Sequence, residues 1–338
     1  MKYLSRALLS IVCLLLLTGL VWLVKKNQSS PPPSGEAFQL VAGWPRLPEG
    51  TRIGQVSGVD VNSNGDIVVF HRADRIWDGE EYGLDSISSP TIFILDDETG
   101  ELIGSWGADM FIIPHGLTID DEDNLWLTDV GLHQVFKFDL KGNLLMTLGE
   151  RGVAGTDNNH FNQPTDVAIA QDGTLYVSDG YGNSRISKFS LGGEFITSWG
   201  TRGNEAGQFD TPHSIALDPD GNLYVADRGN ARLQVFDPDG KFITEWKSPS
   251  LGRPWAVRFD TAGNMYIVDG GDQSTFWPDR ARITKLDAEG NILASFGSYG
   301  NEPGQFIWPH AIATGPDGAL YVGEVATGMR IQKFKPDR

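Results

Sequence analysis

A short motif recurs six times along the 338-residue chain and constrains its fold more than any other feature. Five copies begin with proline, at Pro114, Pro164, Pro212, Pro254 and Pro309, with spacings of 50, 48, 42 and 55 residues. An earlier copy starts at Gln55 and lacks the proline. Each copy continues with a turn rich in Gly, Asn or Asp and with short alternating strands, and none holds a helical apolar period. Repeats of this kind predict four-stranded blades, so we expect an all-β fold, a six-bladed β-propeller.

The order of the strands also predicts how the ring closes. The third and fourth copies end in a fourth strand, at residues 193–199 and 241–246, but the sixth copy stops at Pro336 without one. An unassigned strand at residues 37–41 precedes the first copy. We expect this strand to complete the last blade, because it would cover an exposed sheet edge. Residues 36–338 are therefore predicted to form one domain.

Histidine follows the proline only in the second, fourth and sixth copies, as His115, His213 and His310. Equivalent positions in alternate blades of a six-fold ring lie about 120° apart, so three imidazoles are expected to converge on the axis. Three neutral imidazoles with a fourth position left open are typical of a catalytic zinc site. Alternatively, each histidine forms hydrogen bonds within its own blade, but this does not explain the alternation with Ser57, Thr165 and Trp255. The remaining histidines, His71, His133 and His160, are expected to be ordinary packing or surface residues.

The beginning of the chain predicts a membrane anchor. Residues 7–24 carry no charge, basic residues flank them, and a Pro/Ser-rich linker follows at residues 27–35. Eighteen helical residues span about 27 Å, enough to cross the hydrocarbon core. A cleaved signal peptide is the alternative, but the run is longer than usual and no A-x-A-like site follows it. We expect residues 1–26 to be a signal anchor that tethers the propeller outside the cytoplasmic membrane of a bacterium, although flanking charge alone leaves the orientation open.

Composition excludes several classes of protein. The hydrophobic fraction of 40% excludes a disordered chain, and the single Cys13 lies in the apolar run, so the propeller has no disulfide. A net charge of −17 repels phosphate backbones and anionic lipid headgroups. We therefore expect no nucleic-acid partner and membrane contact only through the N-terminal helix. The other partner expectations are a small-molecule or peptide substrate and a monomeric state.

Several motifs together resemble one enzyme family. They are Ile113-Pro-His-Gly-Leu-Thr-Ile119, Ser178-Asp-Gly-Tyr-Gly-Asn-Ser-Arg185 and the segment from Phe70 to Asp78, combined with the triple Pro-His set. This combination is similar to the peptidyl-α-hydroxyglycine α-amidating lyases, NHL-type propellers that cleave a peptidyl-α-hydroxyglycine into a peptide amide and glyoxylate. The resemblance runs from about Gly43 to the C-terminus.

The resemblance implies roles for particular residues. It implies zinc on the three histidines, Tyr181 as the catalytic base, Arg72 as a charge-stabilising partner and Arg228 as a further active-site arginine. The implied chemistry is consistent, because a carbinolamide must lose its hydroxyl proton while its oxygen is stabilised. The alternatives are structural roles: Tyr181 in a surface turn, Arg72 paired with Asp74 or Asp78, and Arg228 paired with neighbours of Asp227.

Two positions depart from the family pattern. Trp308 stands where the family has a methionine that contacts substrate, which predicts a reshaped pocket. Ala311 stands where the family has an aspartate that binds a structural calcium together with two backbone carbonyls, here those of Val59 and Leu117. Calcium takes 6 to 8 oxygen ligands, so the missing carboxylate argues against it.

Three functions follow in order of preference. The first is a zinc-dependent carbon–nitrogen lyase that acts on α-hydroxyglycine-like carbinolamides. The second is a non-catalytic NHL propeller that binds a protein or glycan through its loops. The third is a propeller metallohydrolase, which usually needs acidic metal ligands that the equivalent strands do not supply.

Overall fold

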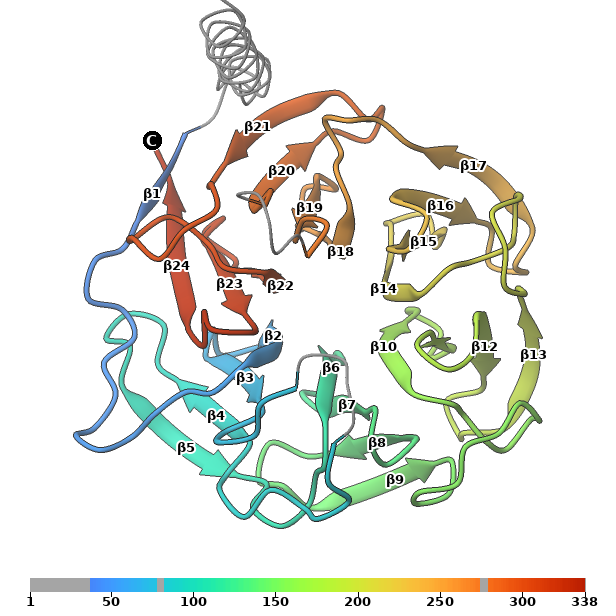
Figure 1. The fold of residues 1–338 in the computed structure, drawn as a ribbon, viewed down its shortest axis with the longest axis horizontal. Coiled ribbons are helices and arrows are strands. Elements are labelled where there is room, and N and C mark those ends of the chain that lie inside the picture. Colours follow the sequence, from blue (N-terminus) through green and yellow to red (C-terminus); the bar gives the residue numbers. More distant parts are fainter. Residues whose placement is uncertain (1–36, 78–81, 274–278, 338) are drawn as a thin grey trace, which may run out of the picture. The chain divides into compact units, whose positions relative to one another are not determined.

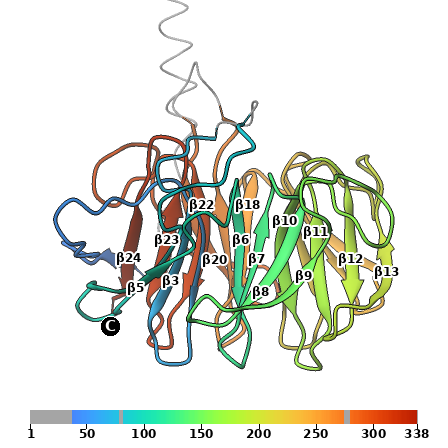
Figure 2. The same ribbon diagram turned by 90° about the horizontal axis from the view of Figure 1, so that it is seen from below.

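The computed structural model describes residues 37–77, 82–273 and 279–337, and within them 24 β-strands form six four-stranded antiparallel sheets. The sheets are arranged as blades around a central axis (Figure 1), and Figure 2 shows the ring edge-on with connecting loops on both faces. The predicted all-β, six-bladed β-propeller is confirmed.

The blades are numbered here in the order of their innermost strands. Blade 1 consists of β2 (Val56–Val61), β3 (Ile67–His71), β4 (Ile92–Leu95) and β5 (Leu102–Trp106). Blade 2 consists of β6 (Pro114–Ile119), β7 (Leu125–Asp129), β8 (Gln134–Phe138) and β9 (Leu144–Leu148). Blade 3 consists of β10 (Pro164–Ile169), β11 (Leu175–Asp179), β12 (Arg185–Phe189) and β13 (Phe195–Trp199).

The remaining blades follow the same plan. Blade 4 consists of β14 (Pro212–Leu217), β15 (Leu223–Asp227), β16 (Arg232–Phe236) and β17 (Phe242–Trp246). Blade 5 consists of β18 (Pro254–Phe259), β19 (Met265–Asp269), β20 (Arg282–Leu286) and β21 (Ile292–Phe296). Blade 6 consists of β22 (Pro309–Thr314), β23 (Leu320–Glu324), β24 (Ile331–Pro336) and β1 (Phe38–Leu40).

Burial along the strands explains why these segments form blades. Every residue of the second strand of each blade is buried, whereas the outermost strand of blade 1 alternates between half-buried and exposed residues. Second strands such as Leu223–Asp227 are rich in β-branched and aromatic residues, which pack well between two sheets. Asp218 closes the preceding turn by accepting hydrogen bonds from the backbone N–H groups of Asp220 and Asn222, and Gly221 supplies the positive φ of 83°.

The first and last strands of the propeller close the ring. β1 pairs antiparallel with β24, with Phe38 opposite Pro336 and Leu40 opposite Phe334. Figure 1 shows this blue strand lying beside the red one. Phe38 and Leu40 pack against the core shared by blades 5 and 6. The predicted completion of the last blade by the N-terminal strand is therefore confirmed.

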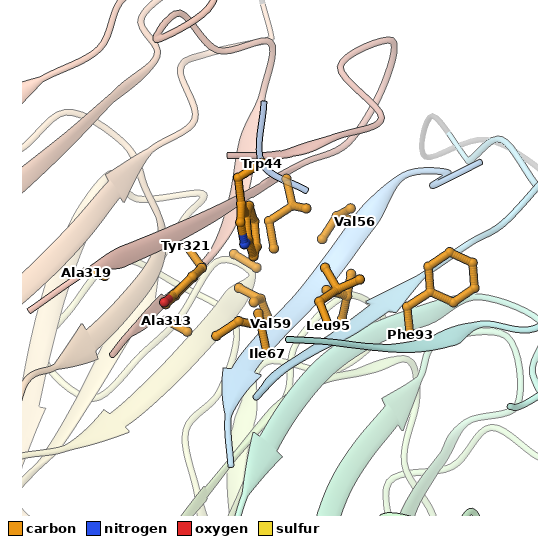
Figure 3. Packing of buried hydrophobic residues seen from close by; sticks show 12 residues of the cluster. Trp44, Val56, Val59, Ile67, Phe93, Leu95, Ala313, Ala319 and Tyr321 are labelled. Atoms are coloured by element: carbon orange, nitrogen blue, oxygen red, sulfur yellow. The ribbon is translucent and has the colours of Figure 1, made fainter. Parts of the chain in front are cut away.

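The hydrophobic core is divided into layers between neighbouring blades. The layer between blades 6 and 1 joins Val59 and Ile67 to Tyr321, and the Trp44 ring packs at a tilt of 52° with its centroid 5.4 Å from that of Tyr321 (Figure 3). Because the apolar side chains of each layer come from two neighbouring blades, each blade is buried only when both of its neighbours are in place.

No helix in the described ranges is long and apolar enough to cross a bilayer. The predicted anchor and linker, residues 1–35, lie outside those ranges and stay a prediction.

Candidate metal centre and its pocket

The three alternate-blade histidines lie together on the propeller axis. His115, His213 and His310 are the second residues of β6, β14 and β22, and each is at most 4% exposed. Their ring centroids are 4.7 to 4.8 Å apart, and their planes meet at 70 to 72°. The structure thus brings these side chains into a nearly three-fold arrangement.

Backbone carbonyls of the intervening blades orient these rings. The Nδ1 atom of His115 lies 2.7 Å from the Thr165 carbonyl oxygen, and that of His213 lies 2.6 Å from the Trp255 carbonyl oxygen. The Nδ1 atom of His310 lies 2.9 Å from the carbonyl oxygen of Ser57. A carbonyl only accepts hydrogen bonds, so Nδ1 carries the proton in each ring and Nε2 keeps its lone pair.

Electrostatics keep the rings neutral. Burial lowers the pKa of all three histidines well below the usual value. The positive charges of Arg72 and Arg228 lower the pKa of His115 and His310 further, and Arg228 does so for His213. Neutral imidazole is the form that binds metal ions.

The donor set fits a metal ion. The three histidines offer one ligand atom each within 4.8 Å of one another, and no carboxylate belongs to this group among the described residues. Three buried imidazoles whose other nitrogens are hydrogen-bonded to carbonyls are a donor set compatible with zinc.

Tyr181 lies against the histidines. Its hydroxyl is 3.1 Å from Nε2 of His115 and 2.9 Å from Nε2 of His213. The residue follows β11 at a point where the chain passes tightly against blade 4, since a Cβ on Gly180 would lie 2.0 Å from the Pro212 carbonyl oxygen. Only glycine permits this approach. The tyrosine is therefore part of the centre and does not sit in a remote surface turn.

Arg72 lies beside the centre with one unsatisfied donor. It is 2% exposed, its Nε donates to the Pro114 carbonyl oxygen at 3.0 Å, and its Nη1 donates to Oε1 of Gln55 at 2.7 Å. Its Nη2 is buried and has no partner within the described ranges. Burial lowers the pKa of Arg72 to about 10. Within those ranges no ion pair joins it to Asp74, and Asp78 lies outside them.

Arg228 packs against the ring of Tyr181. Its guanidinium carbon lies 5.2 Å from the Tyr181 ring centroid and 4.7 Å from that of Trp255, and its Nη1 donates to the Tyr181 hydroxyl at 3.4 Å. The neighbouring Asp227 accepts instead from Nε of Arg232 at 2.8 Å. The geometry thus places Arg228 at the centre and not in an ion pair with Asp227.

A cavity of about 310 Å³ opens beside these groups. Its walls include Trp308, as predicted, whose ring lies 6.1 Å from that of Trp255. Sequence reasoning did not assign Trp77, Tyr82, Gln163, Trp255 and Gln273, which also line it. One available sequence signal was position, because Gln163, like the predicted Trp308, directly precedes a motif proline. In the structure both residues have positive φ, 64° and 47°. Such strained residues cluster at functional sites.

The set of calcium ligands implied by the resemblance lacks its carboxylate. Ala311 offers no carboxylate, and the Leu117 carbonyl oxygen, on β6, accepts a hydrogen bond from Arg258 at 3.4 Å. Val59, the other expected carbonyl donor, lies on β2. The residues present do not fit a calcium ion.

Fold and centre together define a six-bladed propeller whose three axial histidines are arranged to hold a metal ion. A model of the NHL repeat matches residues 161–189 and 209–236. Peptidyl-alpha-hydroxyglycine alpha-amidating lyase 2 of Drosophila melanogaster is 36% identical over 327 residues, covering 91% of this chain and 77% of the fly protein. The chain belongs to the peptidyl-α-hydroxyglycine α-amidating lyase family.

Two further comparisons show how far this similarity extends. The peptidylglycine alpha-amidating monooxygenase of Rattus norvegicus is 40% identical over 330 residues, and this chain spans 90% of its own length but only 32% of the rat protein. A streptogramin B lyase structure matches with a TM-score of 0.58 at 13% identity, covering 89% of this chain and 98% of that one. At that identity the match shows the shared fold alone.

Proposed function

We propose that the protein is a zinc-dependent carbon–nitrogen lyase that converts peptidyl-α-hydroxyglycine-like carbinolamides into an amide and glyoxylate. The names of its relatives support a lyase-type function. The observation that carries the proposal is the Tyr181 hydroxyl, which lies within hydrogen-bond distance of two axial histidines and of Arg228.

The reaction requires a base at the substrate hydroxyl. That hydroxyl loses its proton, the carbon–nitrogen bond breaks as the glyoxylate carbonyl forms, and the amide nitrogen takes up a proton. Tyr181 Oη, in its phenolate form, is the proton acceptor in this proposal and becomes the neutral phenol. Arg228, packed on its ring, stabilises the phenolate. When bound by His115, His213 and His310, zinc supplies a Lewis acid for the substrate oxygen.

Arg72 is proposed to hold the anionic end of the substrate. Its unpartnered Nη2 belongs to a side chain that lines the cavity, and a guanidinium matches the two oxygens of a carboxylate. Trp77, 4.8 Å from the guanidinium, keeps that group in place. The aromatic walls formed with Trp255 and Trp308 accommodate the acyl part.

Tyr181→Phe tests the proposal. With N-benzoyl-α-hydroxyglycine as substrate, it is expected to lower glyoxylate release by about 10² to 10⁴, the usual contribution of a general base. Zinc content should stay at the wild-type level, because the histidines are unchanged. Tyr299→Phe is the matched control, since Tyr299 is 38% exposed and does not line the cavity. A zinc-loaded wild type that releases no glyoxylate would refute the substrate class, and an active Tyr181→Phe would refute the base.

We also propose that residues 1–26 anchor the chain and that the propeller acts as a monomer on the extracytoplasmic side. The uncharged run at residues 7–24 and the acidic composition support this arrangement. External protease should digest the propeller in intact spheroplasts. Protection from that protease would show that the propeller lies on the cytoplasmic side of the membrane.

A further inference from the structure

One charged side chain on the propeller axis has no part in the proposed chemistry. Arg258 is the fifth residue of β18, three positions beyond the histidine level of the motif. The equivalent residues of the other innermost strands are Asp60, Thr118, Ala168, Ala216 and Ala313. Arg258 is thus the one basic side chain at this level of the channel, and its side chain is only 19% exposed.

The guanidinium of Arg258 is surrounded by oxygen atoms from four blades. Its Nη1 donates to Asp166 Oδ2 at 3.0 Å and its Nη2 to Asp166 Oδ1 at 3.3 Å, a bidentate pair with a carboxylate that is 4% exposed. The same Nη1 lies 3.1 Å from the Ile215 carbonyl oxygen and 3.2 Å from the Ser214 hydroxyl. Further acceptors are the carbonyl oxygens of Val257, at 2.9 Å, and Leu117, at 3.4 Å.

A second carboxylate adds negative charge at this level. Asp60, on β2, accepts hydrogen bonds from the backbone N–H groups of Val61 and Ile119 at 2.9 and 2.8 Å. It also interacts electrostatically with Arg258. Two carboxylates around a narrow channel repel each other, so a cation between them stabilises the inner strands.

Carbonyl, carboxylate and hydroxyl oxygens are the ligands that a hard divalent cation takes. The calcium site implied by the family resemblance shares one of these oxygens, the Leu117 carbonyl. It also requires the Val59 carbonyl and a carboxylate at position 311, where this chain has alanine. We propose that Arg258 is a built-in cation that replaces a structural calcium ion on the axis, so that the propeller folds and works without calcium.

The position of this cation connects it to the metal centre. Leu117 lies two residues beyond His115 on β6, and Ser214 directly follows His213 on β14. By joining these strands to blades 3 and 5, Arg258 holds two of the three histidine-bearing strands at a fixed separation. Its role is structural: it does not line the cavity of about 310 Å³, but it lines the narrow axial space beneath the three histidines together with them.

The first test measures calcium in the wild type. Protein purified in calcium-free buffer with zinc should contain no stoichiometric calcium, and added CaCl₂ should leave its melting temperature unchanged. About one calcium ion per chain, or a calcium-dependent rise in melting temperature, would overturn the proposal.

The second test removes the cation. Arg258→Met keeps the length of the side chain but leaves Asp166 without its partner, and should lower the melting temperature by about 5 to 10 °C. Arg202→Met is the matched control, because Arg202 is 83% exposed and should tolerate the change. Equal melting temperatures for the two variants would contradict the structural role of Arg258.

The third test recreates the ion site. The double variant Arg258→Ala/Ala311→Asp removes the guanidinium and supplies the missing carboxylate, so calcium should bind and raise its melting temperature, as measured by calorimetry with CaCl₂ alone. A folded double variant without calcium affinity would show that Arg258 does not stand in place of the ion. If the double variant fails to fold, the wild-type analysis and Arg258→Met still decide the question.

Discussion

Arginines serve two different purposes in two regions of this propeller. Within the blades, an arginine at the start of the third strand pairs with a fully buried carboxylate at the end of the second, as in Arg185–Asp179 and Arg232–Asp227 at 2.9 and 2.8 Å. Beside the axial histidines, Arg72 and Arg228 contact neutral partners in the described ranges. A guanidinium that is paired with a buried carboxylate stabilises the blade. A guanidinium without a carboxylate partner is available to an anionic ligand.

The blade pairs also support the site indirectly. Asp227 accepts a hydrogen bond from the backbone N–H of Asp210 at 2.7 Å, which fixes the loop that leads into Pro212 and His213. The two regions are therefore separable by experiment: scaffold variants should change stability first, and site variants should change metal content or turnover first.

The largest effect is expected at the metal ligands. His213→Ala should reduce zinc from about one ion per chain to a trace and abolish turnover, because two imidazoles rarely hold a catalytic zinc. Elemental analysis of protein never exposed to chelator checks this. His160→Ala is the control, because His160 pairs with Asp157 on the surface. Full zinc occupancy in His213→Ala would place the metal elsewhere.

Removal of the closing strand should disrupt the scaffold. A chain without residues 1–35 is expected to fold, whereas one without residues 1–45 also loses Phe38, Leu40 and the pairing with β24. The longer deletion exposes an edge of blade 6 and should give aggregation or a much lower melting temperature. Identical melting curves for the two chains would show that β1 contributes little to closure.

Arg72 and Arg232 give the most direct contrast between the two regions. Arg72→Met should lower kcat/KM by about 10² to 10³ while stability stays unchanged or rises, because a buried cation without a carboxylate partner is removed. Arg232→Met should retain zinc and turnover but destabilise the fold by about 3 to 5 kcal/mol, because Asp227 is left buried and unpaired. Urea unfolding and kinetics on both variants check this. A large loss of stability in Arg72→Met would show that this arginine, like Arg232, stabilises the scaffold.

The smallest predicted effect concerns pH. Burial lowers the pKa of His71 to about 3. Between that value and the ordinary pKa near 6.5, only the unfolded chain binds the proton, so stability falls as pH falls. His71→Asn retains the acceptor for the Gly54 N–H group and should flatten this decline in metal-free protein by about 1.4 kcal/mol per pH unit. Urea unfolding at pH 7, 6 and 5 measures it. His160→Asn should not flatten it, because carboxylates raise the pKa of His160.

The features that could be predicted from the sequence are those set by the repeat of the motif. The six copies of the motif fixed the blades, the missing fourth strand of the last copy identified β1, and the alternate spacing located the three histidines on the axis. Tyr181, Arg72 and Arg228 lie in turns after the second strands, where no period determines side-chain direction, and only the family resemblance indicated them. Trp77, Tyr82 and Gln273 lie in irregular loops and gave no signal. Arg258 lies on a regular strand, but its role depends on Asp166, 92 residues away.

The hydrogen bonds from the ring nitrogens of even blades to the carbonyl oxygens of odd blades require an even number of blades. Each imidazole of an even blade depends on the backbone of the following odd blade, and the last dependence runs from His310 to Ser57 across the point of closure. Such a pattern returns to its own start only in a ring with an even number of blades. A ring of five or seven would force two like blades to be neighbours. Six blades supply three imidazoles, the number that leaves one position of a tetrahedral ion open.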